Sequence, residues 1–329
     1  MTETVRFGVI GCGDHGRRLT QALTGVPGAR LVACSDANPA ALASFPGEGL
    51  ERYNSGAEML AQAQIDAVIV VTAHAALAAT ATAALESGRH VFCEKPMAVN
   101  AAQGRPVVEA ARRAGRNLMV GYCLRYDALR AWTKRLIDQG AVGDIRYVCA
   151  GKGGQPLTGW LADRAVGGGE LMWLGSHLVD QVNWMVGRRA ERVYAEMVRQ
   201  PDGITDQTSV FTIRYEGGVL AHLDCSQGQH ANSDYVEIVG SQGRIHTAWV
   251  PRMVMTVHSN VIPEYREPTE IRPLDTNWLQ MYTEELREFV ASIQEGRQPA
   301  VSGEDGLRAL EILDAVDESA ERNAPIPLF

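Results

Sequence analysis

The sequence lacks the features that mark membrane-bound, secreted and nucleic-acid-binding proteins. None of its apolar runs is long enough to span a bilayer. The first residues, MTETVRFGVIG, contain no basic segment followed by an apolar one, as a secretory signal peptide would. Lys and Arg number 31 against 39 Asp and Glu, and the formal net charge of −8 weighs against binding to nucleic acid. We therefore expect a cytoplasmic protein that binds neither a membrane nor a nucleic acid.

The spacing of the cysteines excludes two common kinds of site. None of the six forms a C-x-x-C pair, and no cluster of ligand-type residues has the spacing of a structural zinc site. Four of them lie in apolar runs typical of strands, so we expect buried free thiols in a reducing compartment and no metal. The cysteines are Cys12, Cys34, Cys93, Cys123, Cys149 and Cys225.

The length and composition suit two globular domains. The chain has 329 residues, of which 46% are hydrophobic and 21% charged. In the first third, near-continuous apolar runs alternate with stretches of helical character, which indicates a doubly wound parallel sheet covered on both faces. The runs are TVRFGVIG, ARLVACSD, DAVIVVT, HVFCEKP and NLMVGY. We place this domain at residues 1–121.

Two details of the intervening helices can be predicted. Ser55 and Glu58 have the spacing of a capping box, which predicts a helix that begins after Ser55. The helical stretch at residues 100–115 contains Gly104 and Pro106, so we expect that helix to be interrupted.

A glycine-rich loop joins the first predicted strand to the first predicted helix. It has the pattern G-x-G-x-x-G, whose glycines permit a tight turn, close approach of a pyrophosphate and close packing of helix on strand. Asp36 ends the second predicted strand, where an acid accepts hydrogen bonds from ribose hydroxyls and repels a 2′-phosphate, which favours NAD over NADP. S-adenosylmethionine is an alternative ligand for such a loop. The loop residues are Gly11, Cys12, Gly13, Asp14, His15 and Gly16.

The stretch CEKPMA decides between these ligands. Glu94, Lys95 and Pro96 follow a strand at the carboxyl edge of the sheet, where such folds bind ligands, although a lysine there is also compatible with a solvated strand end. With the glycine loop and Asp36, this stretch resembles the Gfo/Idh/MocA oxidoreductases, the family of glucose–fructose oxidoreductase and inositol dehydrogenase. The resemblance covers essentially the whole chain. It rests on GVIGCGDHG, CEKP, GYCLRYD, GGGELMWLGSHLVD and the carboxyl-terminal GEDGLRALEILDAVDESAERNAPIPL.

The resemblance implies roles for several first-domain residues. Lys95 would lie beside the nicotinamide and the reacting carbinol, Glu94 would lie near the nicotinamide ribose, and the Lys95–Pro96 bond is a candidate for the cis form. Residues 72–74 align with a Thr-Pro-Asn segment that contacts the cofactor in the family. Pro and Asn are replaced here, so backbone contacts could persist while side-chain contacts are in doubt. The residues concerned are Thr72, Ala73 and His74.

Residues 122–329 have a different pattern, which predicts an α+β domain. An amphipathic stretch, CLRYDALRAWTKRLIDQG, precedes a series of strand-like runs, and YEGGVL and GSQGRI read as hairpin turns. Such strands favour a large, mostly antiparallel sheet with one open face, which in the family is commonly an oligomer interface. Two helices are predicted near 278–295 and 304–322. The strand-like runs are DIRYVCAGK, RVYAEMVRQ, TSVFTIRY, GVLAHLDCSQ, DYVEIVGS and RIHTAWV.

The stretch GGGELMWLGSHLVDQ is the candidate catalytic segment of this domain. It predicts a buried helix in which Trp173, His177 and Asp180 share one face. A histidine on an apolar helix is often only a core residue. The family pattern G-G-G-x-L-x-D-x-G-x-H-x-x-D instead directs its first Asp and its His into the substrate pocket. His177 and Asp180 match this pattern, whereas Trp173 replaces the first Asp.

The resemblance therefore implies a substrate site with Lys95 and His177 as catalytic pair. Histidine suits general acid/base work, Asp180 would support His177, and Trp173 would form an apolar wall. Other candidate substrate contacts are weaker, and Arg125 is equally compatible with an interdomain ion pair. These candidates are Tyr122, Arg125 and Trp160.

The predicted function is that of an NAD-dependent dehydrogenase or reductase. It would move a hydride between nicotinamide and a secondary carbinol of a sugar, cyclitol or sugar derivative, and would act as a homo-oligomer. Two alternatives remain. One is a regulator that binds dinucleotide without catalysis, as a yeast galactose-pathway repressor of this fold does. The other is a reductase of a C=N bond or of a flat conjugated substrate such as a tetrapyrrole.

Overall fold

The structure is a computed structural model that describes residues 4–199, 206–228, 232–250, 252–272 and 277–328. The chain forms two compact units. The first comprises Met1–Tyr126 and Asn277–Arg308, and the second comprises Asp127–Thr276 and Ala309–Phe329. The predicted division into a cofactor-binding part, residues 1–121, and a substrate-binding part, residues 122–329, stays a prediction. The packing adds that a late segment, Asn277–Arg308, joins the amino-terminal unit.

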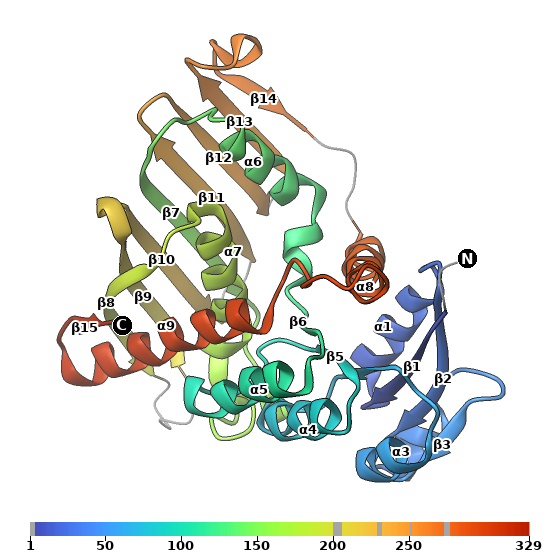
Figure 1. The fold of residues 1–329 in the computed structure, drawn as a ribbon. Helices are drawn as coiled ribbons and strands as arrows, with labels where there is room; N and C mark the ends of the chain where they lie inside the picture. Colours follow the sequence, from blue (N-terminus) through green and yellow to red (C-terminus); the bar gives the residue numbers. More distant parts are fainter. Residues whose placement is uncertain (1–3, 200–205, 229–231, 251, 273–276, 329) are drawn as a thin grey trace. The chain divides into compact units, whose positions relative to one another are not determined.

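The first unit is built on a six-stranded parallel sheet with strand order β3-β2-β1-β4-β5-β6 (Figure 1). The order reverses beside β1, which is the switch point where doubly wound sheets bind ligands at their carboxyl edge. Strands β1, β4, β5 and β6 are almost wholly buried and apolar, as predicted, whereas β2 is buried only over its last three residues and β3 is mainly exposed. They are β1 Val5–Ile10, β2 Ala29–Ser35, β3 Glu51–Tyr53, β4 Ala67–Val70, β5 His90–Cys93 and β6 Leu118–Val120.

Helices complete this unit. Phe289 of the late helix packs edge-on against Phe7 of β1 and Phe92 of β5, with ring centroids 6.1 and 5.9 Å apart. That helix, α8, therefore covers the sheet on the same side as α1, along which it packs. The helices are α1 Asp14–Leu23, α2 Pro39–Ala43, α3 Gly56–Gln62, α4 His74–Glu86, α5 Ala101–Ala114, α8 Trp278–Gln294 and the 3₁₀ turn η1 Cys123–Tyr126.

Local predictions for this unit were partly wrong. Helix α5 runs through Gly104 and Pro106 without interruption, because its Asn100 cap and its buried apolar face outweigh the unfavourable proline, which costs about 3 kcal/mol in a helix interior. Ser55 does cap α3 through the amide of Glu58, but the Glu58 carboxylate reaches the amide of Asn54 rather than that of Ser55. The short strand β3 was not predicted from the sequence.

The second unit contains a nine-stranded sheet with order β14-β13-β12-β11-β7-β10-β9-β8-β15. Among the described strands, β7 and β10 pair in parallel and the other pairs are antiparallel, so the prediction of a mostly antiparallel sheet is confirmed. The predicted hairpins β9–β10 and β11–β12 are present. The strands are β7 Ile145–Gly154, β8 Ala190–Arg199, β9 Asp206–Tyr215, β10 Leu220–Gln227, β11 Ser233–Gly240, β12 Gly243–Val250, β13 Val254–Ser259, β14 Thr269–Ile271 and β15 Ile326–Pro327.

One face of this sheet is covered by helices and the other is open (Figure 1). Along β9 buried and exposed residues alternate, as expected when only one face is packed. Large exposed apolar side chains lie on these strands, namely Tyr147, Tyr194, Val198, Val210 and Leu220. The helical elements are α6 Ala128–Asp138, η2 Gly159–Ala162, the π turn η3 Leu171–Gly175, α7 Ser176–Val186, η4 Glu216–Gly218, η5 Pro263–Tyr265 and α9 Gly303–Arg322. The first residues of α9, up to Arg308, belong to the first unit.

The remaining sequence expectations concern helices and thiols. The two carboxyl-terminal helices are confirmed as α8 and α9, and no described helix is long and apolar enough to cross a membrane. The cysteines are free, as expected, and five of the six are buried. Cys149 is half-buried on β7, because it lies on the face of the sheet that the helices leave open.

Candidate functional site

The glycine loop has the geometry that a dinucleotide requires. Gly11 has φ +113°, and a Cβ there would lie 2.3 Å from the carbonyl oxygen of Val71. A Cβ at Gly16 would lie 2.2 Å from the carbonyl oxygen of Gly11, so neither position admits a side chain. Gly13, the N-cap of α1, has open space around it and no side-chain cap. The amino terminus of α1 is thus open to a phosphate.

Asp36 is held against this loop. Its Oδ2 accepts a hydrogen bond from the amide of Cys12 at 2.7 Å, and its Oδ1 accepts one from the amide of Asn38 at 2.8 Å. Each carboxylate oxygen has a second lone pair, so Asp36 can still accept ribose hydroxyls. Hydrogen bonding to Cys34, together with burial, raises the pKa of the Cys12 thiol above its ordinary range. Cys12 therefore contributes its backbone to the site rather than a reactive thiolate.

Glu94 and Lys95 stand beside the same loop, at the carboxyl end of β5. The Glu94 Oε1 lies 2.9 Å from Nε2 of His15, and Oε2 accepts a hydrogen bond from the Lys95 amide at 2.9 Å. Burial alone would raise the pKa of Glu94, but His15 and Lys95 outweigh it and hold that pKa below its ordinary value. Lys95 is 7% exposed, and the Lys95–Pro96 bond is cis, as the resemblance suggested.

Residues 72–74 follow β4 at this edge of the sheet. Thr72 and Ala73 are half-buried, whereas His74 begins α4 and is buried. The Thr72 hydroxyl donates to the carbonyl of Ala73 at 3.3 Å. Since the His74 side chain is directed into the protein, the backbone and Thr72 are the groups of this segment that remain for a bound cofactor.

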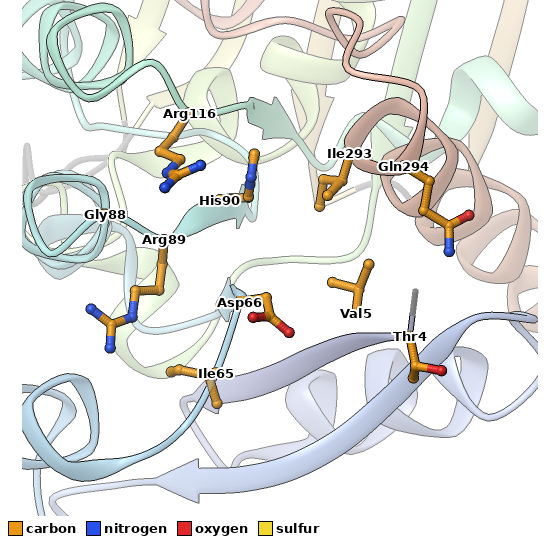
Figure 2. A pocket seen from close by; sticks show the side chains of 10 residues that line it. All are labelled: Thr4, Val5, Ile65, Asp66, Gly88, Arg89, His90, Arg116, Ile293 and Gln294. Carbon is orange, nitrogen blue, oxygen red and sulfur yellow. The ribbon is translucent and has the colours of Figure 1, made fainter. Parts of the chain in front are cut away.

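A cavity of about 530 Å³ in the first unit lies at the opposite edge of the sheet (Figure 2). Its lining includes the starts of β1, β4 and β5, whereas doubly wound sheets bind ligands at the carboxyl ends. The acid of its lining has a partner: Asp66 accepts two hydrogen bonds from the Arg6 side chain at 2.9 and 2.8 Å. Burial and the charge of Arg116 lower the pKa of His90 to about 4. Asp66 and His90 therefore belong to the packing at the base of the sheet.

Two substrate candidates follow β6 in the first unit. Tyr122 is 1% exposed, and the Arg125 guanidinium lies 3.6 Å from Oδ1 of Asp305. Arg125 and Asp305 belong to the same unit, so the ion pair considered for Arg125 is present but does not join two units. The roles of both residues toward a substrate stay predictions.

The catalytic candidates of the second unit lie on one helical segment. Gly168 and Gly169 have φ of +83° and +78° and make the turn that precedes it. The chain then winds as a π turn through Trp173 before α7, a geometry in which backbone hydrogen bonds join residues five rather than four apart. His177 is 8% exposed, Asp180 is buried and Trp173 is half-buried.

The start of this segment is held by an acid that the sequence did not reveal. Asp206 lies at the start of β9. Its Oδ1 accepts a hydrogen bond from the amide of Glu170 at 2.9 Å, and its Oδ2 accepts one from the amide of Leu171 at 2.7 Å. Burial raises the pKa of Asp206 despite these hydrogen bonds. Because Asp206 is far from the segment in sequence, no local capping pattern could have identified it.

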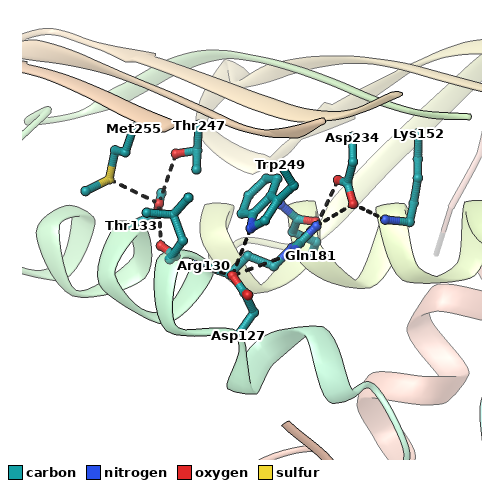
Figure 3. Close-up of polar contacts among 10 residues, drawn as sticks. Asp127, Arg130, Thr133, Lys152, Gln181, Asp234, Thr247, Trp249 and Met255 are labelled. Atoms are coloured by element: carbon teal, nitrogen blue, oxygen red, sulfur yellow. Dashed lines mark hydrogen bonds and ion pairs between the residues drawn. The ribbon is translucent and has the colours of Figure 1, made fainter. Parts of the chain in front are cut away.

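A buried network of charges fixes α7 to its neighbours (Figure 3). The Arg130 guanidinium donates to both oxygens of Asp234 at 2.8 Å and to Oε1 of Gln181 at 3.1 Å, and it stacks 3.4 Å from the centroid of Trp249. Lys152 also pairs with Asp234. Burial would raise the pKa of Asp234, but Arg130 and Lys152 outweigh it and lower that pKa. Gln181 belongs to α7, so the network positions the helix that carries His177.

We expect Lys152→Met to lower the free energy of unfolding by about 1–3 kcal/mol at neutral pH, because it removes one cation from a buried carboxylate. Because the pKa of Asp234 is lowered in the folded state, ionised Asp234 stabilises the protein at neutral pH, and this stabilisation is lost as the pH falls. The difference in free energy of unfolding between the wild type and Lys152→Met should therefore shrink below about pH 4. Urea unfolding at neutral pH and below about pH 4 measures this difference. Lys134→Met, which removes a pair with Asp138, is the control and should cost less than about 1 kcal/mol. Equal losses in the two variants would contradict the prediction.

The candidate residues thus form two groups. The glycine loop, Asp36, Glu94 and Lys95 come together in the first unit, and Trp173, His177 and Asp180 lie on one segment of the second. Trp160 lies on η2, whose backbone packs against Gly167 just before that segment, and is 43% exposed.

The two parts of the chain that carry these groups each match a known protein family model. Residues 5–122 match the Gfo/Idh/MocA description "Oxidoreductase family, NAD-binding Rossmann fold", and residues 134–328 match "Oxidoreductase family, C-terminal alpha/beta domain". The myo-inositol 2-dehydrogenase of Thermotoga maritima is 28% identical over 335 residues, with 98% of each chain covered. The inositol 2-dehydrogenase of Burkholderia cenocepacia is 29% identical over 343 residues, with 99% of this chain and 96% of that protein covered.

A solved structure extends the similarity to the fold. Scyllo-inositol dehydrogenase from Lactobacillus casei, with bound NAD(H) and scyllo-inositol, has a TM-score of 0.82 and 26% identity to this chain, with 99% of each chain covered.

Proposed function

Because the chain belongs to the Gfo/Idh/MocA oxidoreductase family, we propose that it transfers a hydride between NAD and a secondary carbinol or carbonyl of a sugar, cyclitol or sugar derivative. The observation that carries the proposal is that Lys95, the Glu94 carboxyl beside His15 and the open glycine loop meet at one sheet edge. Inositol dehydrogenases among the relatives support the substrate class.

The reaction divides between cofactor and protein. Bound NAD supplies the hydride acceptor, and the protein supplies orientation and proton transfer. Lys95 would bind the carbinol oxygen and orient its C–H bond. His177 would take the hydroxyl proton as the C–H hydride leaves and the C=O bond forms, and would return the proton in the reverse direction. Asp180 would support His177, and Trp173 would offer an apolar face to the substrate ring.

The cofactor and the remaining substrate contacts complete the proposal. The backbone of the loop residues Gly11, Cys12, Gly13, Asp14 and His15 would hold the pyrophosphate, and Thr72 with the backbone of Ala73 and His74 would adjoin the cofactor. Tyr122, Arg125 and Trp160 are the further candidate substrate contacts.

We expect Asp36→Ser to weaken the binding of NAD and to reduce the discrimination against NADP. Hydrogen bonds to a charged acceptor contribute about 1.5–3 kcal/mol, so KM for NAD should rise by about tenfold or more, while KM for NADP should fall because a repelling charge is gone. Steady-state kinetics with both cofactors measure the two effects. Asp138→Ser, a surface change, should alter neither value. An unchanged NAD/NADP ratio in Asp36→Ser would show that Asp36 does not set the preference.

The proposed function is tested by initial rates of NADH formation with NAD and a panel of cyclitols, aldoses and sugar acids. A clear rate on one subgroup would establish a sugar or polyol dehydrogenase. NAD binding without turnover of any member would direct the search to carbonyl or imine reduction with NADH. Binding without turnover in either direction would favour the regulator.

The open face of the nine-stranded sheet is our proposed surface for a homo-oligomer. The exposed Tyr147, Tyr194, Val210 and Leu220 would be buried there, and a cytoplasmic location agrees with the free cysteines. Light scattering of the protein, alone and with Leu220→Asp, measures the subunit number and its dependence on this face.

A further inference from the structure

A buried acid of the first unit has no role in the proposed reaction so far. Glu285 lies in the middle of α8, the helix that packs along α1 (Figure 1). It is 0% exposed, and within the part of the chain that the structure describes neither of its carboxyl oxygens has a hydrogen-bond partner. A carboxylate in that position would be strongly destabilised, so Glu285 requires an explanation.

The surroundings of Glu285 connect it to the glycine loop. Tyr282, one turn earlier on α8, packs edge-on against His15 with ring centroids 5.4 Å apart. His15 in turn lies 2.9 Å from the Glu94 carboxylate. The negative charge of Glu94 acts on both Tyr282 and Glu285. The four residues therefore form one cluster behind the proposed nicotinamide end of the site.

Two carboxyl groups in such a cluster cannot both ionise easily. Glu94 has the His15 ring, the Lys95 amide and the Lys95 charge to stabilise its anion, and its pKa is lowered despite burial. Burial, reinforced by the charge of Glu94, raises the pKa of Glu285 well above its ordinary value. The proton of the pair therefore resides on Glu285, and Glu94 is the carboxylate.

We propose that Glu285 is a positioning residue of the cofactor site, a buried carboxylic acid kept neutral so that the adjacent Glu94 remains a carboxylate aligned between His15 and Lys95. This inference rests on the proposed function, because Glu94 matters only where the dinucleotide binds. The charged or titratable groups that face the cluster are Glu94 and Lys95 after β5, His15 and Arg18 on α1, Cys123 on η1 and Tyr282 on α8.

The first test uses the protein without cofactor. The infrared spectrum at about pH 8 should contain the C=O stretch of a protonated carboxylic acid that Glu285→Gln removes and Glu284→Gln keeps. Glu284 is the matched control, because it precedes Glu285 on α8 and pairs with Arg287 near the surface. If Glu285→Gln does not fold, Glu285→Met replaces it. A spectrum from which neither Glu285 variant removes a band would show that Glu285 is ionised and would overturn the proposal.

The second test is a pH dependence. The folded protein holds a proton that the unfolded chain releases above about pH 4.3, so stability falls as pH rises from there until Glu285 ionises in the folded state. As the pH rises from about 5, the Tm of Glu285→Gln should therefore increase relative to that of the wild type for as long as the wild type keeps its infrared band. Glu284→Gln should show no such gain. Parallel Tm curves for Glu285→Gln and the wild type would count against the inference.

Cofactor affinity separates a positioning role from a merely structural one. Near pH 7 the NADH dissociation constants of wild type and Glu285→Gln should agree within about threefold. At the pH where the wild type loses its infrared band, its NADH affinity should fall by up to about tenfold per pH unit, and Glu285→Gln should escape that fall. If the wild-type infrared band persists over the whole pH range and NADH affinity stays constant, the result agrees with the proposal. If the band disappears while NADH affinity does not fall, the proposal is overturned. Absence of turnover with every substrate would count against the proposed function and leave these readouts intact.

Discussion

Replacement of Lys95 by methionine should reduce kcat by about 10³-fold and change the NADH dissociation constant by less than about fivefold. Lys95 is a buried cation beside the ionised Glu94 and follows the strand that ends at the cofactor edge. Methionine keeps the bulk of the side chain but can neither donate to the carbinol oxygen nor help to move its proton. Steady-state rates on the best substrate of the panel and fluorescence titration with NADH measure the two quantities.

The control for Lys95 is Lys134→Met, which removes a lysine that pairs with Asp138 and should leave kcat unchanged. A wild-type kcat in Lys95→Met would remove Lys95 from the mechanism. A variant that loses NADH affinity and turnover together would instead make Lys95 a cofactor ligand.

Replacement of His177 by alanine should reduce kcat by about 10²–10⁴-fold while NADH affinity stays within about twofold. The glycine loop and Asp36 belong to the first unit and His177 to the second, so loss of the imidazole leaves the predicted cofactor contacts unchanged. Added imidazole should restore part of the rate, because it returns a base that a purely structural histidine would not need. The measurement is kcat with and without imidazole, alongside the NADH titration.

A buried histidine can also matter for stability, so the Tm of His177→Ala must be followed. His222→Ala is the matched control: His222 lies on β10 of the same unit and is half-buried. It should keep the wild-type kcat. Full activity in His177→Ala would leave His177 as a core residue, which is the ordinary role of a histidine on an apolar helix.

Trp173 replaces the first Asp of the family pattern, a second departure beside those at Ala73 and His74. An Asp at that position could couple to the histidine, whereas an indole offers an apolar surface. The π turn through Trp173 ends two residues before His177, so the helical register between Trp173 and His177 is not that of a regular α-helix. The substrate panel is the means to learn whether this change affects the choice of substrate.

Local sequence patterns were sufficient to predict the parts of this protein whose requirements fall on neighbouring residues. Buried apolar strands, the glycine loop, the acid after β2 and the lysine after β5 are each encoded within a few residues, because a strand end or a tight turn imposes its requirements on neighbours in the chain. The same is true of the hairpins and of the two last helices. The family resemblance then connected Lys95 with His177, which no local pattern could do.

The tertiary structure alone decided the features that join distant segments. It showed that α8 belongs to the first unit and carries Glu285 to the cluster around Glu94, that Asp206 holds the start of the segment with His177, and that Arg130, Asp234 and Lys152 form one buried network. It also kept α5 continuous through Pro106. The physical reason is common to all of these: burial and charge pairing depend on what packs nearby in space, and sequence periodicity reports only which face of an element is apolar.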